Sequence, residues 1–182
     1  MPRALVPLAQ GCEEIEAVSI INVLRRGGVE VVTAGLAEGA VRGSRGTMIQ
    51  PDTTLDRVLD QEFDLVALPG GQPGTDHLRR DARIAALLQR QAARGGWIGA
   101  VCAAPLVLAE AGLLEDRRVT CFPGTLDDDA HGAKLEDAGV VVDGRLITGR
   151  SAGMAMDFAL ALVEALAGEA KRDDVEKRLV RG

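Results

Sequence analysis

A cysteine that directly follows an apolar segment is the residue of this sequence best suited to covalent chemistry. Residues 97–101 predict a short buried strand, and Cys102 comes immediately after it. Pro105 suits the first turn of a helix, where its missing N–H costs nothing. A strand, a nucleophile and a helix in this order predict a sharp elbow that exposes the thiol and aims backbone N–H groups at its target. The start of a helix also favours a thiolate. The alternative is that Cys102 is a small buried hydrophobic residue.

A carboxyl group that could exchange a proton with this thiol is that of Glu16. It heads a line of apolar residues, Ile20 and Val23, on a predicted helix. A carboxyl group in apolar surroundings tends to keep its proton and can then donate a hydrogen bond to a thiolate. The alternative is a surface glutamate in the first helical turn, where the helix dipole favours negative charge. We expect Glu13 and Glu14 to have that surface role.

Two glycines follow the predicted strand 64–68 and could supply backbone donors. Gly70 and Gly71 could approach a bound oxygen and donate an N–H to an oxyanion. Paired glycines also occur in simple turns after strands. A phosphate site is less favoured, because no Gly-Lys-Ser/Thr sequence follows. Arg45 and Arg150 could hold an anion near such a pocket, although arginines at a surface are the default.

The other cysteines and the two histidines do not form a recognisable site. Cys12 is either an exposed thiol or a residue at the start of a helix, and Cys121 ends an apolar segment typical of a core. His77 is expected on a helix surface, and His131 in the solvated polar stretch 127–131. Without a CxxC pair or suitably placed histidines, the sequence predicts no metal, no organic cofactor and no disulfide framework.

The order of the predicted elements indicates one α/β domain over residues 1–182. Strands that are apolar throughout and alternate with helices predict a mostly parallel sheet with helices on both faces. Ligands of such sheets bind at the carboxyl ends of the strands, so the loops after Ala9, Leu68 and Val101 should meet there. The expected strands are 3–9, 29–34, 64–68, 97–101, 119–122, 140–142 and 146–148, with a hairpin over 41–51. The expected helices are 13–26, one from Thr75 or Asp76 to Gly95, one beginning near Pro105, 155–167 and 171–180.

Composition excludes several classes of protein. The chain has 182 residues, of which 47% are hydrophobic, and a net charge of −6. This composition is typical of a globular domain and argues against electrostatic binding of nucleic acid. Apolar runs are too short for a membrane span or a signal peptide. The three scattered cysteines suit the reducing cytoplasm, where we expect the protein. The helix 13–26 carries more apolar residues than one sheet face can cover, which predicts a twofold homodimer.

Taken together, these motifs resemble the ThiJ/PfpI superfamily, in the branch of YajL and the Parkinson-disease-linked protein deglycase. The resemblance extends over nearly the whole chain, in order. The matching segments are Gly11-x-Glu13-Glu14-x-Glu16, Leu68-Pro-Gly-Gly71, Ala100-x-Cys102-Ala-x-Pro105 and residues 158–166. The resemblance implies a flavodoxin-like α/β sandwich, a homodimer and a cofactor-free glyoxalase that turns methylglyoxal into lactate. Repair of glycated proteins or nucleotides, chaperone action and oxidation sensing are also attributed to this family.

The resemblance also implies a role for each matching residue. Cys102 is the reactive cysteine at a strained elbow, and Glu16 is the protonated carboxyl beside it. Gly71 and Ala103 supply the oxyanion N–H groups, with Gly70 adjoining them. Arg45 matches a family arginine near the dimer contact.

The sequence departs from the pattern of this branch at two places, and from that of the protease-like members at a third. Phe122 stands where the branch has a histidine before a proline, which removes an imidazole and makes the pocket more apolar. Residues 150–153 read Arg-Ser-Ala-Gly instead of Arg-Gly-Pro-Gly. Ala103 stands where protease-like members carry a histidine, which argues against a peptidase.

The leading hypothesis is a glyoxalase that acts on small dicarbonyls through Cys102 and Glu16. A second hypothesis is a redox-regulated stress chaperone with little turnover, in which Cys102 is oxidised to a sulfinic acid. A glutaminase-like amidotransferase ranks last, because neither histidine is placed for it.

Overall fold

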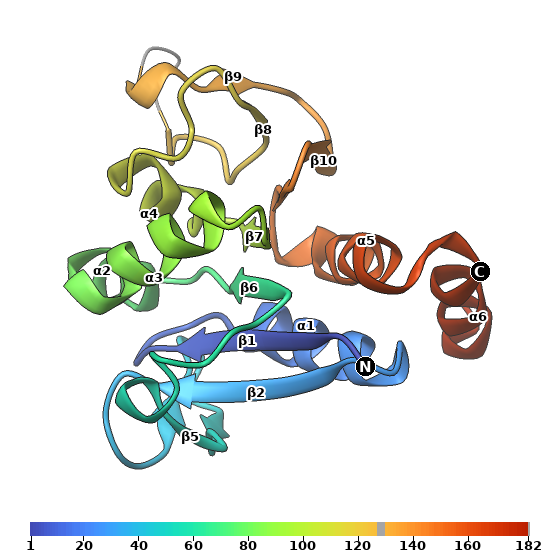
Figure 1. The fold of residues 1–182 in the computed structure, drawn as a ribbon, viewed down its shortest axis with the longest axis horizontal. Helices are drawn as coiled ribbons and strands as arrows, with labels where there is room; N and C mark the ends of the chain where they lie inside the picture. The colour runs from blue at the N-terminus through green and yellow to red at the C-terminus, as the bar shows by residue number, and fades with distance from the viewer. Residues whose placement is uncertain (127–129, 182) are drawn as a thin grey trace.

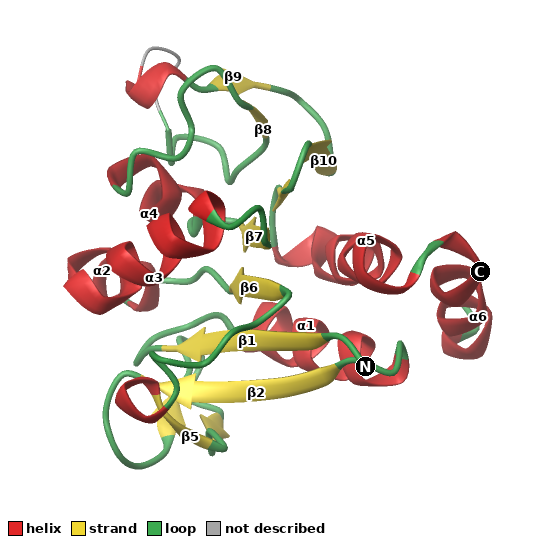
Figure 2. Ribbon diagram, viewed as in Figure 1, coloured by secondary structure: helices red, strands yellow, loops and turns green. Residues whose placement is uncertain are grey.

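The computed structural model describes residues 1–126 and 130–181, and its centre is a mixed β-sheet (Figure 2). Within these residues, the sheet has seven strands in the order β10-β11-β7-β6-β1-β2-β5. β10 and β11 pair antiparallel, and all other neighbours pair parallel. The strands are β1 (Arg3–Leu8), β2 (Glu30–Gly35), β5 (Thr53–Thr54), β6 (Leu65–Leu68), β7 (Trp97–Val101), β10 (Val140–Asp143) and β11 (Leu146–Gly149). The predicted, mostly parallel sheet is thereby confirmed.

Helices cover both faces of this sheet (Figure 1). α1, α5 and α6 contribute buried residues to one face, and α2, α3 and α4 to the other. The helices are α1 (Glu14–Arg26), α2 (Gly74–Arg80), α3 (Ala82–Ala93), α4 (Pro105–Glu110), α5 (Ala155–Ala167) and α6 (Glu169–Leu179). Two small sheets lie outside the central one: β3 (Val41–Arg42) with β4 (Met48–Ile49), and β8 (Arg118–Val119) with β9 (Lys134–Leu135).

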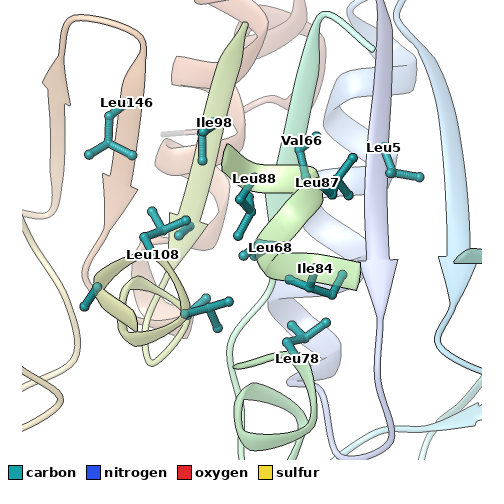
Figure 3. Close-up of a cluster of buried hydrophobic side chains, with 14 of the residues drawn as sticks. Leu5, Val66, Leu68, Leu78, Ile84, Leu87, Leu88, Ile98, Leu108 and Leu146 are labelled. Atoms are coloured by element: carbon teal, nitrogen blue, oxygen red, sulfur yellow. The ribbon is translucent and has the colours of Figure 1, made fainter. Parts of the chain in front are cut away.

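The core has two halves, one on each face of the sheet. Figure 3 shows the half under α2, α3 and α4, where leucine and isoleucine side chains of α3 and α4 pack on the strands. Along β6, Val66 and Leu68 belong to this half, whereas Leu65 and Ala67 belong to the half under α1 and α5. Successive side chains of a strand point to opposite faces, so a strand covered on both faces must be apolar throughout.

The structure corrects two of the expected elements. The single helix expected from Thr75 or Asp76 to Gly95 is wrong, because the chain breaks at Asp81 between α2 and α3. The Asp81 side chain accepts the N–H of Arg83 at 3.0 Å and also binds its guanidinium group, so it caps a new helix. The strand expected over 119–122 is shorter, and β8 ends at Val119.

The topology brings three loops to one edge of the sheet. β7, β6 and β1 are neighbours and run parallel, so the chain leaves all three at their shared carboxyl edge. The chain continues from β1 to β2, which lies on one side of β1 in the sheet, and later enters β6, which lies on the other side. The strand order therefore reverses at the carboxyl end of β1, the place where sheets of this kind bind ligands. The loops after Leu8, Leu68 and Val101 lie together there, as the sequence predicts.

Candidate active site

Cys102 lies at the sharp turn between β7 and α4. Its φ of +62° is in the left-handed region, which a residue with a side chain rarely adopts. The Cys102 N–H donates to the carbonyl oxygen of Gly149 at 2.9 Å, and the Cys102 carbonyl accepts the N–H of Phe122 at 2.9 Å. Such strain persists only where surrounding contacts hold it, and it is typical of functional sites. The predicted elbow is therefore confirmed.

The half-buried Cys102 thiol lies among hydrogen-bond donors. The backbone N–H groups of Ala103 and Gly71 hydrogen-bond to its sulfur, and both lower its pKa. These are the two N–H groups to which the family resemblance assigns an oxyanion. The loop after β6 and the elbow after β7 thus contribute one donor each to the same place.

Glu16 is fully buried in the first turn of α1. Its Oε2 accepts the N–H of Gly70 at 2.7 Å. In the described part of the chain, no hydrogen-bond partner lies within bonding distance of its buried Oε1. Burial raises the pKa of Glu16 to about 7, against the opposing effects of the Gly70 N–H and of Cys102. The sequence predicts a carboxyl group that keeps its proton in apolar surroundings, and the raised pKa of Glu16 confirms the direction of that shift.

The expected low pKa of Cys102 is not found while Glu16 carries its negative charge. Burial and that charge together raise the pKa of the thiol to about 12, and the N–H groups of Ala103 and Gly71 do not offset them. Two negative charges cannot be held this close at low cost in a buried site. Cys102 and Glu16 are therefore a coupled pair, and their titrations belong to the pair.

Gly70 lets the loop after β6 approach the elbow closely. A Cβ atom on Gly70 would lie 2.7 Å from the carbonyl oxygen of Val101 and 2.9 Å from both the Ala103 nitrogen and Glu16 Oε2. Gly71 has a φ of +88°, and a Cβ atom there would overlap the backbone nitrogen of Glu13. Any larger residue at either position would push the donors away from the thiol.

Glu14 has a structural role that the sequence did not reveal. Instead of lying at the surface, it is 8% exposed and accepts the N–H groups of Arg45 and Thr47, at 2.7 and 3.1 Å, and the hydroxyl of Ser44 at 3.2 Å. These hydrogen bonds lower its pKa against the desolvation that raises it. Gly43 makes room for this carboxyl group, because a Cβ atom at that position would overlap the Glu14 side chain.

Arg45 is exposed on the β3–β4 hairpin. Its backbone contacts Glu14, and its side chain forms no ion pair with the described residues. The structure does not join it to Cys102, so its substrate role stays a prediction. Arg150 pairs with Asp137.

The remaining candidates lie as follows. Cys12 is fully buried, so the exposed-thiol alternative is wrong, and burial raises its pKa to about 11. Cys121 is half-buried and packs against the core under α2, α3 and α4.

His77 is exposed and its Nδ1 lies 2.9 Å from the carbonyl of Gln10. His131 is exposed as expected, and residues 127–129 beside it lie outside the described residues.

Residues 1–126 and 130–181 contain neither a metal-binding cluster nor a membrane-spanning helix. No three His, Cys, Asp or Glu side chains in these ranges gather closely enough to hold a metal ion. Across the same residues, no helix has the length and apolar character needed to cross a membrane.

A flavodoxin-like α/β sandwich with a strained elbow cysteine beside a buried carboxyl group defines the class of this protein. The chain belongs to the DJ-1/PfpI family, whose model matches residues 2–165. It is 42% identical over 179 residues to Protein dj-1beta of Drosophila melanogaster, covering 97% of this chain and 96% of the relative. It is 39% identical over 171 residues to the glutathione-independent glyoxalase DJR-1.2 of Caenorhabditis elegans, covering 93% and 91%.

Solved structures agree with this assignment. A structure described as oxidised Toxoplasma gondii DJ-1 matches with a TM-score of 0.94 and 34% identity, covering 100% of both chains. The expected superfamily and the flavodoxin-like fold are both confirmed.

Proposed function

We propose that this protein is a cofactor-independent glyoxalase that converts methylglyoxal and glyoxal to 2-hydroxy acids. One observation carries the proposal: Glu16, a buried carboxyl group with a raised pKa, lies beside the half-buried thiol of Cys102, whose pKa two neighbouring backbone N–H groups lower. The glyoxalase name of the Caenorhabditis elegans relative supports the same reaction class. The exact lyase or deglycase type is part of the proposal.

In the resting pair, Cys102 and Glu16 share one proton near neutral pH. Among the described residues, no hydrogen-bond partner lies within bonding distance of the buried Glu16 Oε1, and an unpaired carboxylate oxygen is costly in such a place. A proton on Oε1 removes that cost and makes the carboxyl a donor to the sulfur. The sulfur, with the Ala103 and Gly71 N–H groups around it, then takes the negative charge. Once Glu16 has lost this proton, its charge opposes ionisation of Cys102.

The reaction begins when Sγ of Cys102 attacks the aldehyde carbon of methylglyoxal. The former aldehyde oxygen takes the proton of Glu16, and a hemithioacetal forms. Glu16, now a carboxylate, removes the hydrogen from this carbon and returns it to the neighbouring carbon, which had been the ketone, while the hydroxyl proton moves from the first oxygen to the former ketone oxygen. The product is a thioester of the 2-hydroxy acid. Water hydrolyses it to lactate and restores Cys102 and the shared proton.

The backbone donors have two tasks in this scheme. The N–H groups of Gly71 and Ala103 hold the sulfur before attack and the developing oxyanion during attack and hydrolysis. Gly70 keeps Glu16 Oε2 in place through its own N–H, so that Oε1 faces the chemistry. Attack on a glycated amine adduct by the same thiolate would extend the activity to deglycation.

The test is lactate formation from methylglyoxal by the purified protein, without glutathione or added metal. We expect lactate from the wild type and from Cys121→Ser, and none above background from Cys102→Ser. Equal rates in wild type and Cys102→Ser, or no lactate from the wild type, would contradict the proposal.

An oxidation sensor with chaperone action is the second candidate. The half-buried Cys102 is accessible to peroxide, and one structural relative is described as oxidised. In this case peroxide would convert Cys102 to a sulfinic acid before Cys12 or Cys121, and the wild type would form no lactate. Peptide mass spectrometry after a peroxide titration, run beside the lactate assay, separates the two candidates.

A twofold homodimer is proposed as the working form. Ile15 and Val18 lie on α1 and are 59% and 48% exposed, and Met48 of β4 is 60% exposed. Residues three apart share a helix face, so Ile15 and Val18 form one apolar surface that a second copy would cover. We expect a dimer at micromolar concentration in sedimentation and a shift to monomer in Val18→Glu. A wild-type monomer would contradict this.

A further inference from the structure

Phe122 differs from the other phenylalanines of the chain. Phe63 and Phe158 are buried, at 2% and 0% exposure, whereas Phe122 is 50% exposed. Its ring is part of neither half of the core. A large aromatic ring left half in water is a site that gains by binding an apolar partner.

The backbone places Phe122 beside the nucleophile. Its N–H donates to the carbonyl of Cys102 at 2.9 Å. The chain turns directly after Phe122, whose carbonyl accepts the N–H of Thr125 at 3.0 Å. The preceding residue, Cys121, packs against the core half under α2, α3 and α4, whereas the Phe122 side chain stays half in water. The exposed ring is thus carried by a residue whose backbone is bonded to the elbow that holds the half-buried Cys102 sulfur.

We propose that Phe122 forms an aromatic-binding subsite beside Cys102, which favours 2-oxoaldehydes with an aromatic substituent over methylglyoxal. The identity of the substrate rests on the proposed function, whereas the subsite itself does not. An aromatic substituent on a substrate held at Cys102 packs against the Phe122 ring and removes apolar area from water. The methyl group of methylglyoxal is too small to cover the ring.

The first experiment compares kcat/KM for phenylglyoxal and methylglyoxal. We expect the wild type to prefer phenylglyoxal by about tenfold and Phe122→Ala to lose most of that preference. Val142→Ala is the matched control, because Val142 is 48% exposed on β10, apart from the elbow. The control should keep the wild-type ratio.

The second experiment needs no turnover. The alkylation rates of Cys102 by N-phenyliodoacetamide and by iodoacetamide are measured by peptide mass spectrometry. These reagents share a reactive group and differ by a phenyl ring. We expect a preference for the phenyl reagent of several-fold in wild type and Val142→Ala, and a loss of it in Phe122→Ala.

The outcomes separate the subsite from the reaction. A phenyl preference in alkylation that Phe122→Ala removes supports the subsite, and if lactate formation is absent at the same time, the glyoxalase proposal alone fails. An equal alkylation preference in wild type and Phe122→Ala overturns the subsite, even where both oxoaldehydes are turned over. Circular dichroism of each variant excludes misfolding as the cause of a lost preference.

Discussion

Two glutamates of the same helical turn end up in opposite electrostatic states. Glu14 accepts hydrogen bonds from Ser44, Arg45 and Thr47, and these bonds lower its pKa. Glu16, two residues further on, accepts one N–H, that of Gly70, and its Oε1 has no hydrogen-bond partner in the part of the chain that the structure describes. Burial raises the pKa of Glu16 to about 7. Both side chains are largely hidden from solvent.

The difference shows what separates a structural carboxylate from a reactive one. Where donors satisfy a carboxylate, its charge is stabilised and it holds the chain in place, as Glu14 holds the β3–β4 hairpin. Where donors are too few, the group keeps a proton near neutral pH and can give it to a neighbour. The Cys102 sulfur lies beside the second kind of group.

The largest expected effect that tests this contrast is on turnover. Glu16→Gln keeps the size and an N–H donor but cannot carry a proton between carbons, so we expect methylglyoxal turnover to fall by about 10²–10⁴-fold. Glu14→Gln is the matched control and should lose far less, because Glu14 does not contact the sulfur. Steady-state lactate assays at pH 7.5 measure both. Similar losses in the two variants would mean that Glu16 also acts only through structure.

Alkylation of the thiol sharpens the same contrast. We expect Cys102 to react with iodoacetamide before Cys12, because Cys12 is fully buried whereas Cys102 is half-buried. We expect it to react before Cys121 as well, because the N–H groups of Ala103 and Gly71 and a protonated Glu16 stabilise the thiolate of Cys102. Above pH 7, Glu16→Gln should react at least as fast as the wild type, because it removes the charge that raises the pKa of Cys102.

Glu16→Leu provides the comparison for the hydrogen bond alone. It removes the charge and also the donor, so its Cys102 should react more slowly than in Glu16→Gln. The measurement is the pH dependence of labelling by mass spectrometry. Identical profiles for the Gln and Leu variants would rule out a hydrogen bond from residue 16 to the sulfur.

Much of the fold could be predicted because each strand and helix is specified locally. The expected helix 155–167 coincides with α5, and the expected strands 140–142 and 146–148 are found as β10 and β11. The break at Asp81 was missed because apolar periodicity continues through it, while a single carboxylate caps a new helix. The short strand β5 was missed because two threonines give no periodicity.

The site could be predicted in its members but not in its electrostatics. Cys102, Glu16, Gly70 and Gly71 were found because each follows a strand or heads a helix. The pKa of Cys102 depends on burial and on the charge of Glu16, which sequence spacing does not contain. The role of Glu14 depends on a hairpin about thirty residues away, and tertiary contacts of that kind leave almost no local signal.

Stability offers the last and smallest test, because the two glutamates should act on it with opposite signs. The pKa of Glu16 is about 7 in the folded protein, above the 4.5 that is usual for a glutamate, so folding holds a proton that the unfolded chain releases. Stability therefore falls as pH rises from about 4.5 to about 7. Glu16→Gln escapes this loss and should be more stable than the wild type at pH 8, by about 3 kcal/mol at most, and close to it at pH 4.5.

Glu14 has a lowered pKa, so its contribution is present above the usual glutamate pKa and disappears as pH falls through its folded value. Glu14→Gln should lose about 1–3 kcal/mol at pH 8, because an amide accepts fewer hydrogen bonds than a carboxylate. Chemical denaturation at pH 4.5 and pH 8 measures both variants, with Glu169→Gln as an exposed control. If Glu16→Gln is less stable than the wild type at pH 8, the buried carboxylate is better satisfied than its contacts indicate, and the contrast between the two glutamates disappears.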